Sequence, residues 1–574
     1  MNDLRMRLRI VAGGGVLVMA MGGLAARLTY LQLGPHEDIR AAIARSREIR
    51  CTIPAARGSI MDCRGKENIL AASVTVWNVC ASPDDVIAEG NADRVADALA
   101  PILGVRPEEI MSKLHRPGSR YAVLKKHVQD ETAEAVRKLG LKGVFLEESS
   151  IRSYPNGASL CHVVGFVNYE GQGGAGVELA FDKYLKGMPG YLGASVDAKR
   201  DRLYSEDDTF IAPVPGADVV LTVDQNIQHM VERALDQVMD EHNAKGAWAI
   251  VQRVRTGEIL AMASRPAFDL NRFFMADMNA MTNRCIGIVY EPGSTFKAIA
   301  ISAALNERTV TPETVFDCEN GAWMYKGRVL RDYHAYSHLS VAEGVKKSSN
   351  ILTAKVSLTL GEERFYRYLK SFGIGQPTGI ELSGEESGIL APPEKWCSYG
   401  ITRIAIGQGV AVTALQLIGV YCAIANDGFM MRPYLVKKVV APSGAVIMEN
   451  HPRVVGRPIS FQTASVMKRL LSGVTEEGGT GAKASLDGYE VAGKTGSAQK
   501  PVPGGYSTTA YVASFVGFLP CDEPEIAIIV VIDEPQPYHT GGVVAAPAFK
   551  RIAGDIVKYL DIPPDSCRLA SAGL

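Results

Sequence analysis

The hydrophobic pattern of this chain opens with an apolar run that has a basic flank. Ile10 to Ala26 is uncharged and mostly apolar, and arginines 5, 7 and 9 precede it. A helix of about this length is near the lower limit for crossing a bilayer, and a basic flank stays in the cytoplasm. The sequence therefore predicts a cytoplasmic N-terminus (1–9), a transmembrane anchor region (10–33) and an extracytoplasmic body. A cleaved signal peptide is the alternative, since Gly23-Leu24-Ala25 resembles a small-x-small cleavage site.

The next part of the chain, 34–212, shows periodic structure but no candidate chemistry. Proline and glycine around an alternating run over 53–62 indicate a strand with tight turns. From Pro83 to Gly140 apolar residues recur at three- and four-residue spacing, which predicts helices. We expect a non-catalytic N-terminal domain over 34–212.

The pattern changes at Pro213-Val214-Pro215-Gly216, which we interpret as a domain boundary. Beyond it a strand is predicted at 219–223, and a helix with an apolar stripe follows, with Asp224 as its N-cap. Four further strands and a closing helix are predicted at 247–251, 259–263, 513–519, 526–532 and 549–560. Such neighbouring strands with segregated helices are typical of an α+β domain, here an antiparallel sheet flanked by helices over 213–574.

Composition narrows the functional classes. Lysine plus arginine (61) nearly balance aspartate plus glutamate (62), so nothing in the overall charge favours nucleic acid. The ten cysteines are scattered without a C-x-x-C pair, and no zinc site or cofactor is predicted. We interpret most of them as buried apolar residues, with one or two disulfides as the alternative.

Three short strings in the C-terminal half carry the candidate chemistry. They are Ser294-Thr295-Phe296-Lys297, Ser348-Ser349-Asn350 and Lys494-Thr495-Gly496, in the order S-x-x-K, S-x-N and K-T-G. Together they supply a serine nucleophile, its base, a proton relay and a cation for an anionic substrate. Ser465 to Lys468 and Ser497 to Lys500 also fit S-x-x-K, so context must decide between the pairs. Only Ser294 stands at the start of a continuous apolar helix.

Each residue of the site receives an expected role. Lys297 lies on the face of Ser294 and acts as base, with a pKa lowered by burial and by the second cation Lys494. Ser348 passes a proton to the leaving amine, and Asn350 bonds to Lys297 and to a substrate amide. Lys494 and Thr495 meet the substrate carboxylate. Gly496 lets a substrate backbone approach, and the N–H groups of Ser294 and Ser497 form the oxyanion hole.

These strings resemble the class B penicillin-binding proteins, the membrane-anchored D,D-transpeptidases that cross-link peptidoglycan. Arg57 to Asp62 is similar to the family's R-G-x-I-x-D box, and Gly176-Val177-Glu178 is similar to its G-x-E element. Further family strings are Glu291 to Lys297, Gly407-Gln408-Gly409 and Gly478-Gly479-Thr480-Gly481. The chain departs from the family at Cys63-Arg64, where R-N is frequent, and at Ser497, where threonine is usual.

The resemblance implies an elongated, pedestal or dimerisation-type N-terminal domain and a penicillin-binding domain, with the protein anchored in the bacterial cytoplasmic membrane. A D-Ala-D-Ala stem peptide would acylate Ser294 with loss of D-Ala, an amine acceptor would take the acyl group, and β-lactam antibiotics would trap the serine. The expected partners are a glycan polymerase of the SEDS family and other division proteins. Ser514 to Phe518 and Ala545 to Phe549 look most like division or spore-cortex enzymes, with the elongation subtype open.

Two other functions use the same strings. A β-lactamase or β-lactam sensor is one, although no E-x-x-L-N string follows Ser348. An inactive division scaffold is the other.

Overall fold

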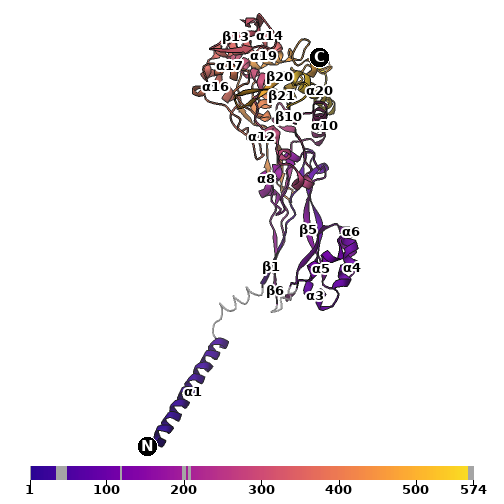
Figure 1. Cartoon of the computed structure of the whole chain (residues 1–574), viewed down its shortest axis with the longest axis vertical. Helices are drawn as coiled ribbons and strands as arrows, with labels where there is room; N and C mark the ends of the chain where they lie inside the picture. The colour runs from indigo at the N-terminus through magenta and orange to yellow at the C-terminus, as the bar shows by residue number, and fades with distance from the viewer. Residues whose placement is uncertain (1, 34–47, 117–118, 197–201, 204–208, 566–574) are drawn as a thin grey trace. The chain divides into compact units, whose positions relative to one another are not determined.

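The computed structural model describes residues 2–33, 48–116, 119–196, 202–203 and 209–565 (Figure 1). The contacts divide the chain into two compact units. One comprises 1–55 with 188–214, and the other comprises 56–187 with 215–574. The boundary expected between residues 212 and 213 stays a prediction.

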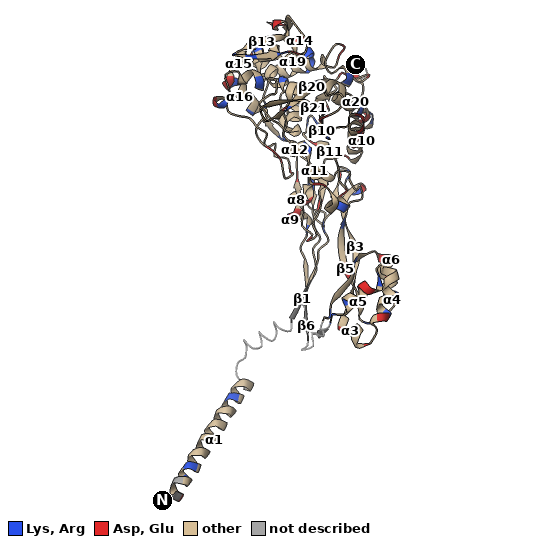
Figure 2. Cartoon of the chain, in the orientation of Figure 1, with Lys and Arg blue, Asp and Glu red and all other residues tan. Residues whose placement is uncertain are grey.

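The first unit contains the expected apolar helix. Helix α1 (Asn2–Leu33) includes one stretch, Met6–Gln32, that is long and apolar enough to cross a membrane, with a mean hydropathy of 1.7. No charged residue lies between Arg9 and Arg27 (Figure 2). The helix begins at Asn2, before the expected start at residue 10, and so includes the three arginines of the basic flank.

The same unit holds a small antiparallel sheet. Strand β6 (Gly190–Val196) pairs with β1 (Glu48–Ile53), β7 (Arg202–Leu203) and β8 (Thr209–Ile211). Of the strand expected over 53–62, only Ile53 belongs to β1, and Ile60–Met61 forms the two-residue strand β2 in the second unit.

The N-terminal part of the second unit mixes helices with a sheet. Strand β3 (Ile69–Ala81) pairs antiparallel with β2, β4 (Ala122–Val128) and β5 (Val144–Ser153). The helices beside this sheet are α3 (Pro83–Ala88), α4 (Ala92–Leu103), α5 (Pro107–Leu114) and α6 (Asp130–Lys138). The purely helical interpretation of 83–140 was wrong at β4. There Ala122 and Leu124 are buried with the period of a strand, and Leu124 lies in one hydrophobic cluster with buried residues of α4 and α5.

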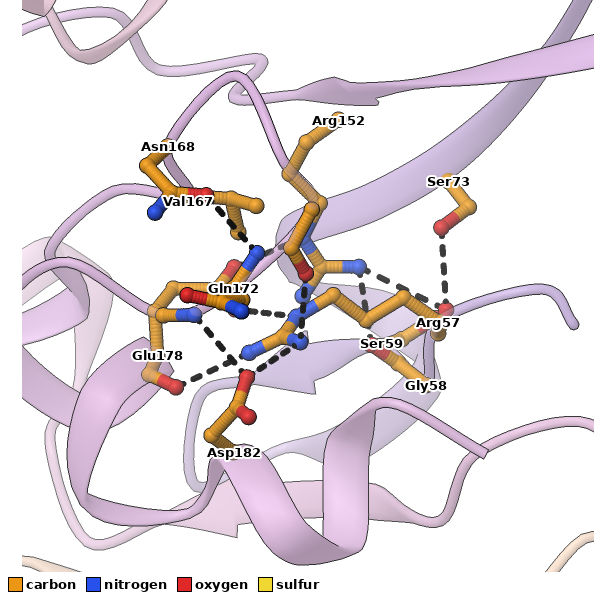
Figure 3. A network of polar contacts seen from close by, with 12 residues as sticks. Arg57, Gly58, Ser59, Ser73, Arg152, Val167, Asn168, Gln172, Glu178 and Asp182 are labelled. Atoms are coloured by element: carbon orange, nitrogen blue, oxygen red, sulfur yellow. Dashed lines mark hydrogen bonds and ion pairs between the residues drawn. The ribbon is translucent and has the colours of Figure 1, made fainter. Parts of the chain in front are cut away.

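A buried ion network joins two of the family-like strings (Figure 3). Arg57 donates to Glu178 at 2.6 Å and to Asp182 at 2.7 Å, and Arg152 donates to the other Glu178 oxygen at 2.6 Å. The Glu178 side chain is fully buried. The network fixes helix α8 (Gly176–Ala180) against strand β5 and the segment that enters β2.

The catalytic candidate lies on a five-stranded antiparallel sheet. Its order is β11-β10-β22-β21-β20, and the strands are β10 (Gly246–Arg253), β11 (Ile259–Arg265), β20 (Ala492–Val502), β21 (Gly505–Leu519) and β22 (Ile526–Asp533). Helices α10 (Gln225–His242) and α20 (Gly541–Tyr559) pack on one face, side by side in Figure 1. Helix α18 (Ala414–Ala425) packs on the other face.

The α+β prediction for this region is confirmed, and so is the order strand, helix, strand, strand. Strand β9 (Asp218–Leu221) precedes α10, and Asp224 accepts the N–H groups of Asn226 and Ile227 as its N-cap. Helix α20 begins at Gly541, earlier than the expected 549, although Pro547 lies inside it. The buried face around Val544 and Phe549 outweighs the single backbone hydrogen bond that an interior proline removes.

Candidate active site

Ser294 lies in a tight turn that leads directly into a buried helix. The turn is a 3₁₀ helix, Gly293–Phe296, and it continues as α13 (Lys297–Asn306). Its backbone is held from both sides, since Thr295 Oγ1 donates to Pro292 O at 2.8 Å and Tyr421 donates to Thr295 O at 2.7 Å. The side chain of Ser294 is partly exposed, whereas that of Lys297 is buried. The turn therefore leaves Ser294 partly exposed, three residues before an enclosed lysine.

The amine of Lys297 contacts the S-x-N string. Lys297 Nζ donates to Ser348 O at 2.6 Å and to Ser348 Oγ at 3.3 Å. Ser348 ends helix α14 (Val341–Lys347) in the left-handed conformation, with φ 59° and ψ 40°, and α15 (Asn350–Leu360) starts two residues later. The turn between the two helices aims the Ser348 carbonyl and hydroxyl at Lys297. The Ser348 hydroxyl, for which a proton relay is expected, therefore lies within hydrogen-bond distance of the Lys297 amine.

Burial governs the protonation of the two site lysines. Loss of hydration lowers the pKa of Lys297 to about 7, while the negative charge of Asp332 opposes that shift. Lys494 is also buried, and both burial and the charge of Lys297 lower its pKa. Burial therefore lowers the Lys297 pKa in the expected direction. The expected contribution of Lys494 is not among the causes of that shift, whereas the charge of Lys297 does lower the pKa of Lys494.

Glycine at position 496 brings the K-T-G strand against the nucleophile turn. A Cβ on Gly496 would lie 2.3 Å from Ser514 Oγ and 3.0 Å from Pro292 O, both too close. Thr495 Oγ1 donates to Thr480 Oγ1 at 3.0 Å, which joins K-T-G to the Gly478–Gly481 string. Ser497 Oγ accepts the first N–H of α20, from Gly541, at 2.9 Å. The Ser497 proton therefore remains free to point toward a ligand.

The side chain of Asn350 lies differently from our expectation. It donates to Arg331 O at 2.8 Å and makes no hydrogen bond to Lys297 in the described part of the chain. Ser349 is buried, and its hydroxyl caps α15. The sequence analysis also missed Asp332, which accepts from Ser349 Oγ at 2.6 Å. Its only sequence signal is a carboxylate after a short strand, which is too common to single it out.

The two rival S-x-x-K pairs are placed for other roles. Lys468 lies on α19 (Phe461–Ser472) and pairs with Asp427 at 3.2 Å. Lys500 lies on β20, where residues three apart point to opposite faces, and pairs with Asp533 at 2.7 Å. Both lysines are held by carboxylates, unlike Lys297. No group of three or more potential metal ligands occurs within the described ranges.

Comparison with known families gives two matches that together cover most of the chain. Residues 247–554 match the penicillin-binding protein transpeptidase domain, and residues 52–221 match the penicillin-binding protein dimerisation domain.

Curated relatives align along nearly the full length. Stage V sporulation protein D of Bacillus subtilis is 33% identical over 98% of this chain and 86% of its own length. Peptidoglycan D,D-transpeptidase FtsI of Escherichia coli is 32% identical over 96% of this chain and 92% of its own length.

Solved structures agree with these relatives. A peptidoglycan synthetase from Bifidobacterium adolescentis superposes with a TM-score of 0.74 at 27% identity, covering 91% of this chain and 98% of that one. Penicillin-binding protein 3 from Mycobacterium tuberculosis, in complex with aztreonam, superposes with a TM-score of 0.69 at 28% identity. The superposition covers 90% of this chain and 98% of that one. The S-x-x-K, S-x-N and K-T-G strings meet within the matched transpeptidase domain. The chain therefore belongs to the class B penicillin-binding proteins, the peptidoglycan D,D-transpeptidases.

Proposed function

We propose that Ser294 is the nucleophile of this transpeptidase and that Lys297 is its general base. One observation carries the proposal: Lys297, the first residue of the helix that follows the Ser294 turn, has a buried amine that is hydrogen-bonded to Ser348, and this burial lowers its pKa to about 7. At neutral pH a substantial fraction of such an amine is unprotonated, and this form can accept the serine proton.

In the first half-reaction, neutral Lys297 takes the proton of Ser294 as its oxygen bonds to the penultimate D-Ala carbonyl of a stem peptide. The C–N bond to the terminal D-Ala then breaks. The proton passes from Lys297 through the hydroxyl of Ser348 to the departing amine. In the second half-reaction, an amine of another stem peptide attacks the ester, loses its proton along the same path and releases Ser294.

The remaining residues bind rather than transfer protons. Lys494 and Thr495 receive the substrate carboxylate, and Ser497 donates its free hydroxyl proton to the same group. The backbone N–H groups of Ser294 and Ser497 stabilise the oxyanion. Gly496 allows the donor peptide to run along β20 as an added strand. Asn350 contacts a substrate amide once the peptide is bound.

Fluorescent penicillin tests the nucleophile. Full-length protein in detergent is labelled, digested and mapped, and a stable adduct is expected on Ser294. Ser294→Ala should abolish the adduct, whereas Ser465→Ala, in a rival S-x-x-K pair, should keep it. Rapid hydrolysis of the penicillin would instead indicate a β-lactamase, and folded wild-type protein without an adduct would indicate a scaffold.

We also propose the cellular placement. Within the described residues one helix is long and apolar enough to cross a membrane, which supports a single-pass protein, and the arginines before it support a cytoplasmic N-terminus with the transpeptidase domain outside the cytoplasmic membrane. The resemblance to FtsI and to a sporulation protein supports a role in septal or spore-cortex wall synthesis. A SEDS-family polymerase is the proposed partner, through the anchor and N-terminal domain (34–212). External protease should remove the body of the protein from intact cells, and a protected body would contradict this topology.

A further inference from the structure

Asp332 binds three groups at the start of helix α15. It follows strand β14 (Arg328–Arg331). Its Oδ2 accepts the Ser349 hydroxyl at 2.6 Å, and its Oδ1 accepts the N–H of Ile351 at 3.1 Å together with the N–H of Asn350. A carboxylate here satisfies helix N–H groups that have no partner within the helix, and it complements the positive helix end.

Arg331 and Asp332 together clamp the S-x-N string. The Arg331 carbonyl accepts from the Asn350 side chain at 2.8 Å, while the Asp332 backbone N–H donates to Gly321 O at 3.1 Å. The clamp holds the residues that follow Ser348. Ser348 has a left-handed backbone, which a residue with a Cβ adopts at a cost of roughly 1 kcal/mol unless its surroundings enforce it. Its aim at Lys297 therefore depends on the clamp.

Asp332 is also the acidic group that acts on Lys297. Burial alone would leave Lys297 unprotonated over a wider pH range, and the charge of Asp332 limits that effect. Lys494, on β20, is the basic group that interacts with Lys297. In the described part of the chain, no charged group of the helices packed on α13, namely α15, α16 (Glu362–Ser371) and α19, adds to these two.

We propose that Asp332 is a positioning residue for the transpeptidase reaction, which shapes the Ser348 turn and sets the pH range in which Lys297 works as base. The inference rests on the proposed roles of Ser294 and Lys297. It predicts two separable effects of Asp332, one through geometry and one through charge.

The test compares two variants that lose the same hydrogen bond but differ in charge. D332N removes the carboxylate charge, while S349A removes the hydroxyl that binds it and keeps the charge. Rates of acylation by fluorescent penicillin are measured on full-length protein in detergent between pH 5 and 9. D332N should lower the maximal acylation rate roughly 10- to 100-fold, the effect of a lost hydrogen bond to a charged group. It should also shift the acid limb, the part of the profile in which the rate rises with pH, to lower pH, because the charge that favours protonated Lys297 is gone.

S349A should lower the maximal rate and leave the acid limb at its wild-type pH. D332E keeps the charge, so its acid limb should also lie at the wild-type pH. If D332N does not fold, D332S takes its place. An acid limb that is the same in D332N and wild type, or that moves equally in S349A, would overturn the inference. Wild-type protein that is not labelled on Ser294 would instead overturn the proposed function.

Discussion

Replacing Glu178 by alanine is expected to destabilise the protein by about 3–4 kcal/mol. The Glu178 side chain is fully buried, and it accepts at 2.6 Å from each of two arginines whose side chains are 8% and 7% exposed. A hydrogen bond to a charged group contributes roughly 1.5–3 kcal/mol, and breaking a buried ion pair costs roughly 3–5 kcal/mol. Arg57 keeps Asp182 as a partner, so the lower half of the range for a broken buried ion pair applies.

Chemical denaturation of the full-length protein in detergent, followed by tryptophan fluorescence, measures the effect. The matched control is Glu109→Ala, which breaks an ion pair with Arg106 at the surface. The Glu109 side chain is 47% exposed and that of Arg106 is 78% exposed. That change should cost less than about 0.5 kcal/mol. A difference between the two variants below about 1 kcal/mol would refute the reasoning, since it would mean that the arginines find other partners or water. Penicillin labelling per folded molecule should be equal in both.

Two other predictions concern the site itself. The rate of penicillin acylation should rise with pH and reach half its maximum near pH 7, because only neutral Lys297 accepts a proton and burial lowers its pKa to about 7; a midpoint near 10 in a stopped-flow profile would contradict this. Gly541→Ala should reduce labelling at least about tenfold and lower the thermal midpoint, since its Cβ would lie 2.2 Å from Ser514 O and 2.3 Å from Gly496 O. Gly554→Ala in the same helix would meet only a Leu486 methyl, at 3.4 Å, and should be tolerated; equal losses in both variants would show that the close packing at Gly541 is unimportant.

Local patterns predicted much of the fold because they report which face of an element is buried. The stripe of α10, with Val231, Leu235 and Val238, and the continuous apolar run of β22, which is buried on both faces, both appear in the sequence as they do in the core. The order of strands is a different matter. β10 pairs with β22, nearly three hundred residues later, and no local period encodes that pairing. Strand β4 was missed because it lies between two helices and its buried residues are few.

The same distinction separates the site residues that sequence reasoning found from those it missed. Ser294 and Lys297 are linked by one helical turn, so their spacing predicts their relation. Asp332 contacts the S-x-N string from the end of a strand, and the Asn350 side chain donates to the Arg331 carbonyl. Neither relation has a spacing rule. The residues that were missed are those whose placement depends on backbone turns.

The two buried lysines explain why so much of the frame consists of tight backbone contacts. Each ammonium loses hydration on burial, and the two repel each other, so Lys297 and Lys494 would gain by moving into water. What prevents this is the position of β20, which is pressed against Pro292 at Gly496 and against α20 at Gly541. Side chains larger than hydrogen at these two glycines would push the strand away and hydrate the lysines. The burial of Lys297 therefore depends on the packing at these two glycines, and this is the physical reason that a mutation at Gly541, outside the three strings, should change the acylation rate.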